Sequence, residues 1–121
     1  MSEIQAGWVE LDLQDKDGSE IKLTLKPTPA AMMAVSRRFN GMDRALSSVR
    51  SVDIEALTFI IAHGAGMASD KKAPDRLRDQ IFYAGAANVA MSCLHYLAIL
   101  QNGGRPLSGL SDESEGDEGN G

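Results

Sequence analysis

The chain has 121 residues, of which 12 are Lys or Arg and 17 are Asp or Glu, so its formal net charge is -5. Five of the acids lie in residues 111–121, which contain no base, so residues 1–110 are formally neutral with 12 acids and 12 bases. A neutral body is poorly suited to binding nucleic acid, and the single cysteine, Cys93, excludes an intrachain disulfide. The length predicts one globular domain over residues 1–110, and residues 111–121 have the composition of a disordered acidic tail.

The N-terminal segment lacks the basic stretch followed by an apolar stretch that is typical of a secretion signal. Asn88 and His95 interrupt the longest apolar runs, so we expect no membrane span. Cys93 lies in an apolar run, which favours a buried thiol in a reducing cytoplasm.

Two stretches that alternate apolar and polar residues, VELDLQ and EIKLTL, predict an amphipathic β-hairpin over residues 8–26. Asp15-Lys16-Asp17-Gly18 lies between them. The first strand places acids on its polar face and the second places lysines there, which favours cross-strand pairing. A lone hairpin is marginally stable in water, so we expect its apolar face to pack on the helices that follow.

Helices are predicted between residues 29 and 102. Thr28 is a suitable N-cap, Pro29 suits the first helical position, and Asn40-Gly41 ends this first helix in a left-handed cap. A short second helix is predicted over Met42–Val49. Ser51 is expected to cap a third helix, which runs from Val52 to about His63.

Gly64-Ala65-Gly66 is expected to terminate the third helix, and Met67–Ala73 reads as a polar loop. A helix restarts at Pro74 and continues to Asn102, with a break predicted near Tyr83–Ala86. The predicted fold class is α+β, mainly α, with an N-terminal β-hairpin packed on a small bundle of about four to five helices.

The segment Val89–Leu100 has almost no polar face, so it is expected to be covered on two sides. One source of the second cover is another subunit or a partner. The other is burial at the centre of the chain's own helical layer. The sequence leaves both alternatives open.

No residue pattern points to catalysis, a cofactor or a metal. Cys93 and His95 are two positions apart, which on a helix separates their side chains by about 200°. His63 precedes glycine at a helix end, where a histidine interacts favourably with the helix dipole, and no phosphate-loop motif is present. We therefore expect a protein that is not an enzyme.

Basic residues cluster in two parts of the chain, and three interpretations stay open for them. They form a solvated face, a nucleic-acid patch, or a patch that receives an acidic segment from this chain's own tail or from a partner. The neutral body disfavours nucleic acid. The residues are Arg37, Arg38, Arg44, Arg50, Lys71, Lys72, Arg76 and Arg78.

Three segments carry a resemblance to a known family: VELDLQDKDGSEIKLTL, MMAVSRRFNGMDRAL and LTFIIAHGAG. In their order and spacing, over roughly residues 8–102, the chain resembles the small tail assembly chaperones of gene transfer agents and related siphophage-like tails. The acidic tail and the polar loop lie outside the shared pattern. No catalytic signature belongs to this resemblance.

The resemblance implies a cytoplasmic, non-enzymatic protein without cofactors that binds the tape measure protein and keeps it soluble and extended during tail assembly. Such a chaperone is absent from the finished particle. The tail tube protein is a further candidate partner, self-association is expected, and neither nucleic acid nor membrane is. The alternative is a structural head–tail connector or minor tail component that stays in the particle. A weaker possibility is an acidic DNA mimic or regulator that uses the tail.

Partner contact is expected through apolar residues of the first and last helices. The chain has six methionines, whose side chains adapt to varied apolar surfaces. The candidate partner-binding residues are Met32, Val35, Phe39, Val89, Tyr96, Leu97 and Leu100.

Overall fold

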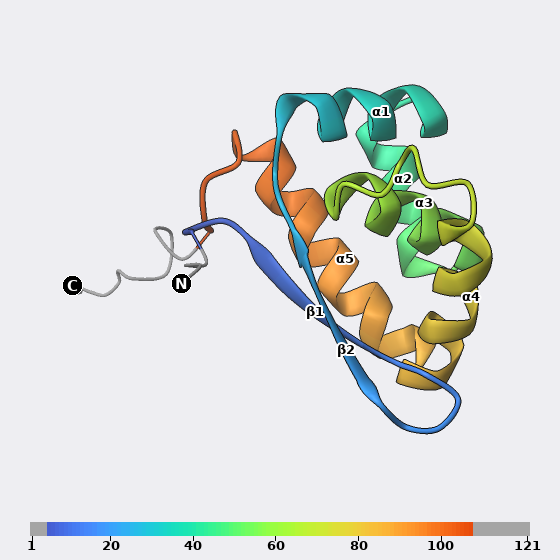
Figure 1. Cartoon of the computed structure of the whole chain (residues 1–121). Coiled ribbons are helices and arrows are strands. Elements are labelled where there is room, and N and C mark those ends of the chain that lie inside the picture. The colour runs from blue at the N-terminus through green and yellow to red at the C-terminus, as the bar shows by residue number, and fades with distance from the viewer. Residues whose placement is uncertain (1–4, 108–121) are drawn as a thin grey trace.

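The computed structural model describes residues 5–107, in which a two-stranded antiparallel hairpin packs against five helices (Figure 1). The fold class is therefore α+β, mainly α, as predicted. The predicted acidic tail, residues 111–121, lies outside the described residues. In chain order the elements are β1 (Val9–Gln14), β2 (Glu20–Leu25), α1 (Pro29–Phe39), α2 (Met42–Arg50), α3 (Ile54–Gly64), α4 (Ala73–Ala84) and α5 (Ala86–Gln101).

The hairpin has the amphipathic register that its sequence predicts. Val9, Leu11 and Leu13 of β1 are buried against the helices, and the residues between them are exposed. On the exposed face Asp12 lies opposite Lys22, and the lysine Nζ is 2.9 Å from a carboxylate oxygen. Both side chains are largely exposed, so this pair specifies register more than it adds stability.

The caps of α1 are those that the sequence predicts. The backbone N–H of Ala31 donates to the Thr28 hydroxyl oxygen at 3.0 Å, which satisfies one unpaired donor of the first turn. At the other end Asn40 has φ 63°, in the left-handed region, and the N–H of Gly41 donates to the carbonyl of Ser36. These two local signals define the length of α1.

The predicted start of α3 is wrong by two residues. Val52 has φ 56° and cannot be the first residue of a right-handed helix, because its backbone is left-handed. Asp53, and not Ser51, is the N-cap, and its carboxylate accepts from the N–H groups of Glu55 and Ala56 at 3.0 and 3.3 Å. The helix therefore begins at Ile54.

The predicted break in the last helical segment is confirmed. α4 ends at Ala84, α5 begins at Ala86, and the two axes are bent by 112° at Gly85. Gly85 has φ 97°, which a residue with a side chain rarely adopts. The bend lets α5 turn back through the fold.

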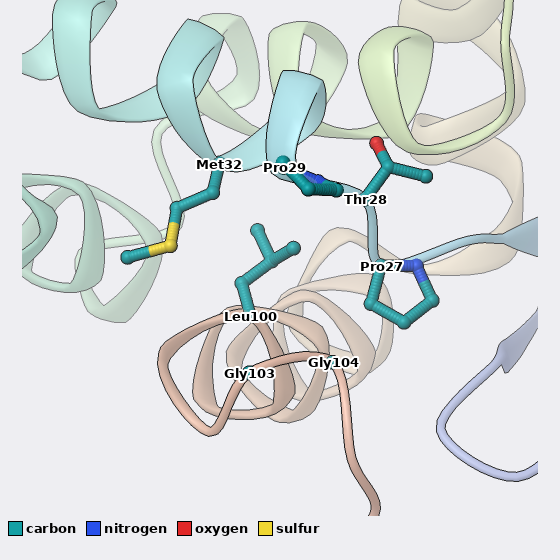
Figure 2. Close-up of a pocket in the computed structure, with 7 residues that line it drawn as sticks. All are labelled: Pro27, Thr28, Pro29, Met32, Leu100, Gly103 and Gly104. Carbon is teal, nitrogen blue, oxygen red and sulfur yellow. The ribbon is translucent and has the colours of Figure 1, made fainter.

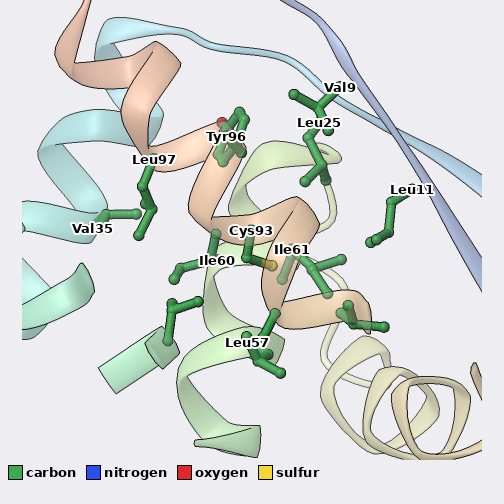
Figure 3. Packing of buried hydrophobic residues seen from close by; sticks show 14 of the residues in the cluster. Val9, Leu11, Leu25, Val35, Leu57, Ile60, Ile61, Cys93, Tyr96 and Leu97 are labelled. Carbon is green, nitrogen blue, oxygen red and sulfur yellow. The ribbon is translucent and has the colours of Figure 1, made fainter. Parts of the chain in front are cut away.

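α5 lies at the centre of the structure, where it contacts β1 and each of the other four helices. Its Cys93 and Leu97 belong to the same buried core as Leu57, Ile60 and Ile61 of α3 (Figure 3). The hairpin crosses one side of α5, and α1 covers its C-terminal end (Figure 1). The remaining exposed side of α5 is the part of this helix that a partner can reach.

Candidate partner-binding surface

The structure places the seven predicted partner-binding residues in two settings. Met32 and Phe39 are half-buried on α1. The other five are buried in the core, none more than 4% exposed: Val35, Val89, Tyr96, Leu97 and Leu100. These five pack the core and offer no surface to a partner in this fold, whereas partner contact by Met32 and Phe39 stays a prediction.

The apolar character of Val89–Leu100 is explained by burial within the chain's own helical layer. α5 is covered on several sides by β1 and by the other helices, so no second subunit is needed to account for these residues. This is one of the two alternatives that the sequence leaves open. The α5 residues selected from the sequence, Val89, Tyr96, Leu97 and Leu100, are all core residues, whereas Met91 of the same helix is exposed.

Met32 and Leu100 meet at a small apolar hollow between the start of α1 and the end of α5 (Figure 2). Its volume is about 190 Å³, and Pro27, Pro29 and two glycines complete the lining. The only hydroxyl there, that of Thr28, already accepts the α1 capping bond. The hollow has the chemistry to accept an apolar side chain, and Thr28 is the only polar side chain in its lining.

Large apolar side chains are nevertheless exposed elsewhere, and sequence reasoning missed their exposure. Phe82 is 72% exposed, Met91 69%, Met33 57% and Tyr83 44%. Phe82 and Tyr83 are in edge-to-face contact, with ring centroids 5.1 Å apart and planes at 81°. Two adjacent aromatics at a predicted helix end were the available signal, because neighbouring helical positions point about 100° apart and a helix end that meets the core on one side seldom buries both.

The exposed face of α5 carries no charge. None of the 16 residues of this helix is Asp, Glu, Lys or Arg, although a surface helix usually has a charged face. Ala87, Asn88, Met91 and His95 are its exposed positions before the last turn. We call Phe82, Tyr83 and these four residues the α4–α5 surface, because the two aromatics lie in the last turn of α4, at the corner where α5 begins.

The titratable groups near α5 do not form a reactive pair. Cys93 is fully buried, and burial raises the pKa of its thiol to about 12, so the reactive thiolate is suppressed. His95 is exposed on the opposite side of the helix. His63 on α3 stacks on Phe59, with ring centroids 4.3 Å apart, and partial burial lowers the pKa of its imidazole.

Within residues 5–107 no group of three or more His, Cys, Asp or Glu side chains is placed to hold a metal ion. In the same part of the chain no single helix is long and apolar enough to cross a membrane, although α4 and α5 pass that test as a bent pair.

In comparisons with known proteins, no family model, no curated protein and no solved structure matches this chain significantly. The resemblance to tail assembly chaperones therefore rests on the three sequence segments that carry it.

Proposed function

We propose that this protein is a tail assembly chaperone that binds the tape measure protein and keeps it soluble and extended during assembly of a phage-like tail, such as that of a gene transfer agent. The proposal is supported by the resemblance of VELDLQDKDGSEIKLTL, MMAVSRRFNGMDRAL and LTFIIAHGAG to that family. It assigns no catalysis to the chain. It places the protein in the cytoplasm and leaves it out of the finished particle.

The observation that carries the proposal is the α4–α5 surface. Phe82 and Met91 are each exposed by more than two thirds, and neither belongs to the buried core. Large apolar side chains that a fold leaves in water favour contact with an apolar partner. A tape measure protein, as a long helical chain with exposed apolar stretches, has that chemistry.

The lack of charge on α5 also suits this partner. A chaperone for a long chain has to bind many different segments, so its surface cannot depend on one pattern of opposite charges. Methionine contacts adapt in shape, and the His95 and Asn88 side chains can form hydrogen bonds with polar neighbours. The α4–α5 surface is therefore suited to binding many different apolar segments rather than one specific sequence.

The experiment that tests this function compares assembling cells with finished particles. We expect deletion of the coding sequence to prevent tail formation, and expression from a plasmid to restore it. Mass spectrometry of purified wild-type particles should then find the tape measure and tube proteins but not this chain.

Recovery of this chain from finished particles at a fixed copy number would contradict the chaperone proposal. That result would instead support the alternative, a head–tail connector or minor tail component retained in the particle. Normal tails in the deletion strain would contradict both functions.

A further inference from the structure

A shallow groove between α1 and α3 is lined by Ala34, Arg37, Arg38, Phe59 and His63, and we call it the Arg38 groove. The Arg38 guanidinium lies 5.5 Å from the ring centroids of both Phe39 and Phe59. The Phe59 ring also stacks on His63. Contact with two aromatic rings restricts the guanidinium, so its N–H donors are held in place at the surface.

Among residues 5–107 no arginine of this region has a carboxylate within ion-pair distance, although Arg38 shares a neighbouring pocket with Glu55, whose carboxylate pairs with Arg78. There the ion pairs use Lys22, Arg76 and Arg78 as the basic members. Residues 29–50 hold four arginines, at positions 37, 38, 44 and 50, against the single acid Asp43, so their net charge is +3. The α1–α2 segment is thus a basic surface whose guanidinium groups are available to an anionic ligand.

The charge of the fold is unevenly distributed. Residues 9–25, the hairpin, hold five acids and two lysines, for a net charge of -3. The hairpin turn lies at the opposite end of the structure from α1 (Figure 1). An acidic peptide is therefore repelled by the hairpin end and attracted to the α1–α2 end.

We propose that the acidic segment of this same chain, residues 111–118, binds at the Arg38 groove, with its carboxylates on Arg37 and Arg38. The segment holds Asp112, Glu113, Glu115, Asp117 and Glu118 and no base. Carboxylate to guanidinium pairing is the strongest polar contact that this composition can make. This inference is independent of the proposed chaperone function, and either can fail without the other.

The segment can reach the groove. Gly103 and Gly104, which follow α5, lie beside Pro29 and Met32 at the start of α1 (Figure 2). Arg38 is nine residues along α1, or about 14 Å at 1.5 Å per residue. After Gly104 the chain turns away from α1 and packs beside Gly7 (Figure 1). Counted from Leu107, the carboxylates lie five to eleven residues further on, which corresponds to about 17 to about 36 Å of extended chain. The upper part of this range, at Asp117 and Glu118, exceeds the summed length of α1 to Arg38 and the roughly 10 Å width of a helix.

The tether favours this chain's own segment over a separate acidic peptide. A covalently linked ligand acts at an effective concentration in the millimolar range, which a free peptide does not reach. Each exposed pair is worth at most about 1 kcal/mol, so several carboxylates and the tether are both needed for a populated bound state.

The test is paramagnetic relaxation in the full-length protein. Ser114→Cys places a spin label amid the carboxylates without removing a charge, and buried Cys93 does not react under native conditions because its thiol is inaccessible. In about 0.1 M salt we expect amide signals of residues 34–38 and 59–63 to lose intensity, and those of the hairpin turn to keep it. Raising salt to about 1 M, which shortens the screening length from about 10 Å to about 3 Å, should restore the lost signals.

The matched variants are Arg37→Gln with Arg38→Gln, and Lys71→Gln with Lys72→Gln as the control. We expect the arginine pair to abolish the effect and the lysine pair to keep it, with amide positions elsewhere showing that both variants are folded. Signal loss that is spread evenly over the surface, or that survives the arginine changes, would overturn the proposal. Loss seen only when spin-labelled protein is mixed with an isotope-labelled copy would also overturn it, because the segment would then bind a second molecule.

Discussion

The phenolic oxygen of Tyr96, in the centre of α5, donates a hydrogen bond to the carbonyl oxygen of Lys26 at 2.7 Å. Lys26 directly follows β2, and its N–H donates to the carbonyl of Gly64, the last residue of α3, at 2.9 Å. One residue therefore joins the hairpin to two helices. Burial of the phenol also raises the pKa of Tyr96, so the hydroxyl stays protonated and remains a donor.

Replacing Tyr96 by Phe should destabilise the fold. The change removes one donor and leaves the Lys26 carbonyl without it, which costs about 1–2 kcal/mol. Urea unfolding should show a lower midpoint with an unchanged slope. The matched control is Tyr83→Phe, since the Tyr83 side chain is 44% exposed, and it should leave the midpoint unchanged. Equal midpoints for the two variants would contradict the role given to Tyr96.

Gly64→Ala should also destabilise the protein, although alanine normally favours a helix. A Cβ at this position would lie 3.1 Å from the Tyr96 hydroxyl and 3.2 Å from the Leu25 Cβ. The crowding should outweigh the gain in helix propensity, for a net loss of about 1 kcal/mol.

The double variant Gly64→Ala with Tyr96→Phe tests the cause. Removing the hydroxyl relieves part of the contact, so the combined loss in unfolding free energy should be smaller than the sum of the single losses. If the losses in unfolding free energy of the two single variants add strictly, positions 64 and 96 are not in repulsive contact.

Asp53→Ala should destabilise the protein by about 1 kcal/mol, because Asp53 caps the first turn of α3. Ser51→Ala should cost less, since Ser51 is the C-cap of α2, where its exposed hydroxyl donates to the carbonyl of Ser48, and it does not cap α3. Unfolding free energies of the two variants check this order. A larger loss of stability for Ser51→Ala than for Asp53→Ala would instead support the helix start predicted from the sequence, with Ser51 as the N-cap of α3.

The free energy of unfolding should fall as the pH drops below the usual pKa of a histidine side chain. Partial burial lowers the pKa of His63 from 6.5, so the unfolded chain takes up a proton there more readily than the folded chain. The stability that neutral His63 contributes is complete above pH 6.5 and is lost as the pH falls through its folded-state pKa. Urea midpoints between pH 7.5 and pH 5 should therefore decline, and His63→Gln should flatten the decline. An equal slope in the variant would assign the effect to other groups.

Local signals explain why much of the fold could be predicted from sequence. The strand alternation, the Thr28 cap, the left-handed Asn40 and the Gly85 break each depend on a few neighbouring residues. The start of α3 was missed because Ser51 and Asp53 are both good caps. The choice between them depends on Val52, whose left-handed backbone no propensity scale favours.

The candidate surface could not be predicted in the same way. Tyr96 and Leu97 are apolar residues on an apolar helix, and only the packing of β1 and the other helices shows that they are inside. Phe82 is equally apolar and lies outside, because the 112° bend at Gly85 decides which side of the α4–α5 corner meets water. Exposure here is a long-range property of the fold.

The measurement that tests the account most directly is co-expression with the tape measure protein encoded nearby, followed by affinity capture and a count of bound copies. Wild-type protein should keep the partner soluble and be captured in many copies. The variant Phe82→Ser with Met91→Ser should bind at least about tenfold more weakly, a loss of about 1.4 kcal/mol. Met33→Ser, which changes a similarly exposed methionine on α1, should bind like wild type. A tape measure protein that stays insoluble with the wild-type chain, or equal binding by the double variant and the control, would contradict the account.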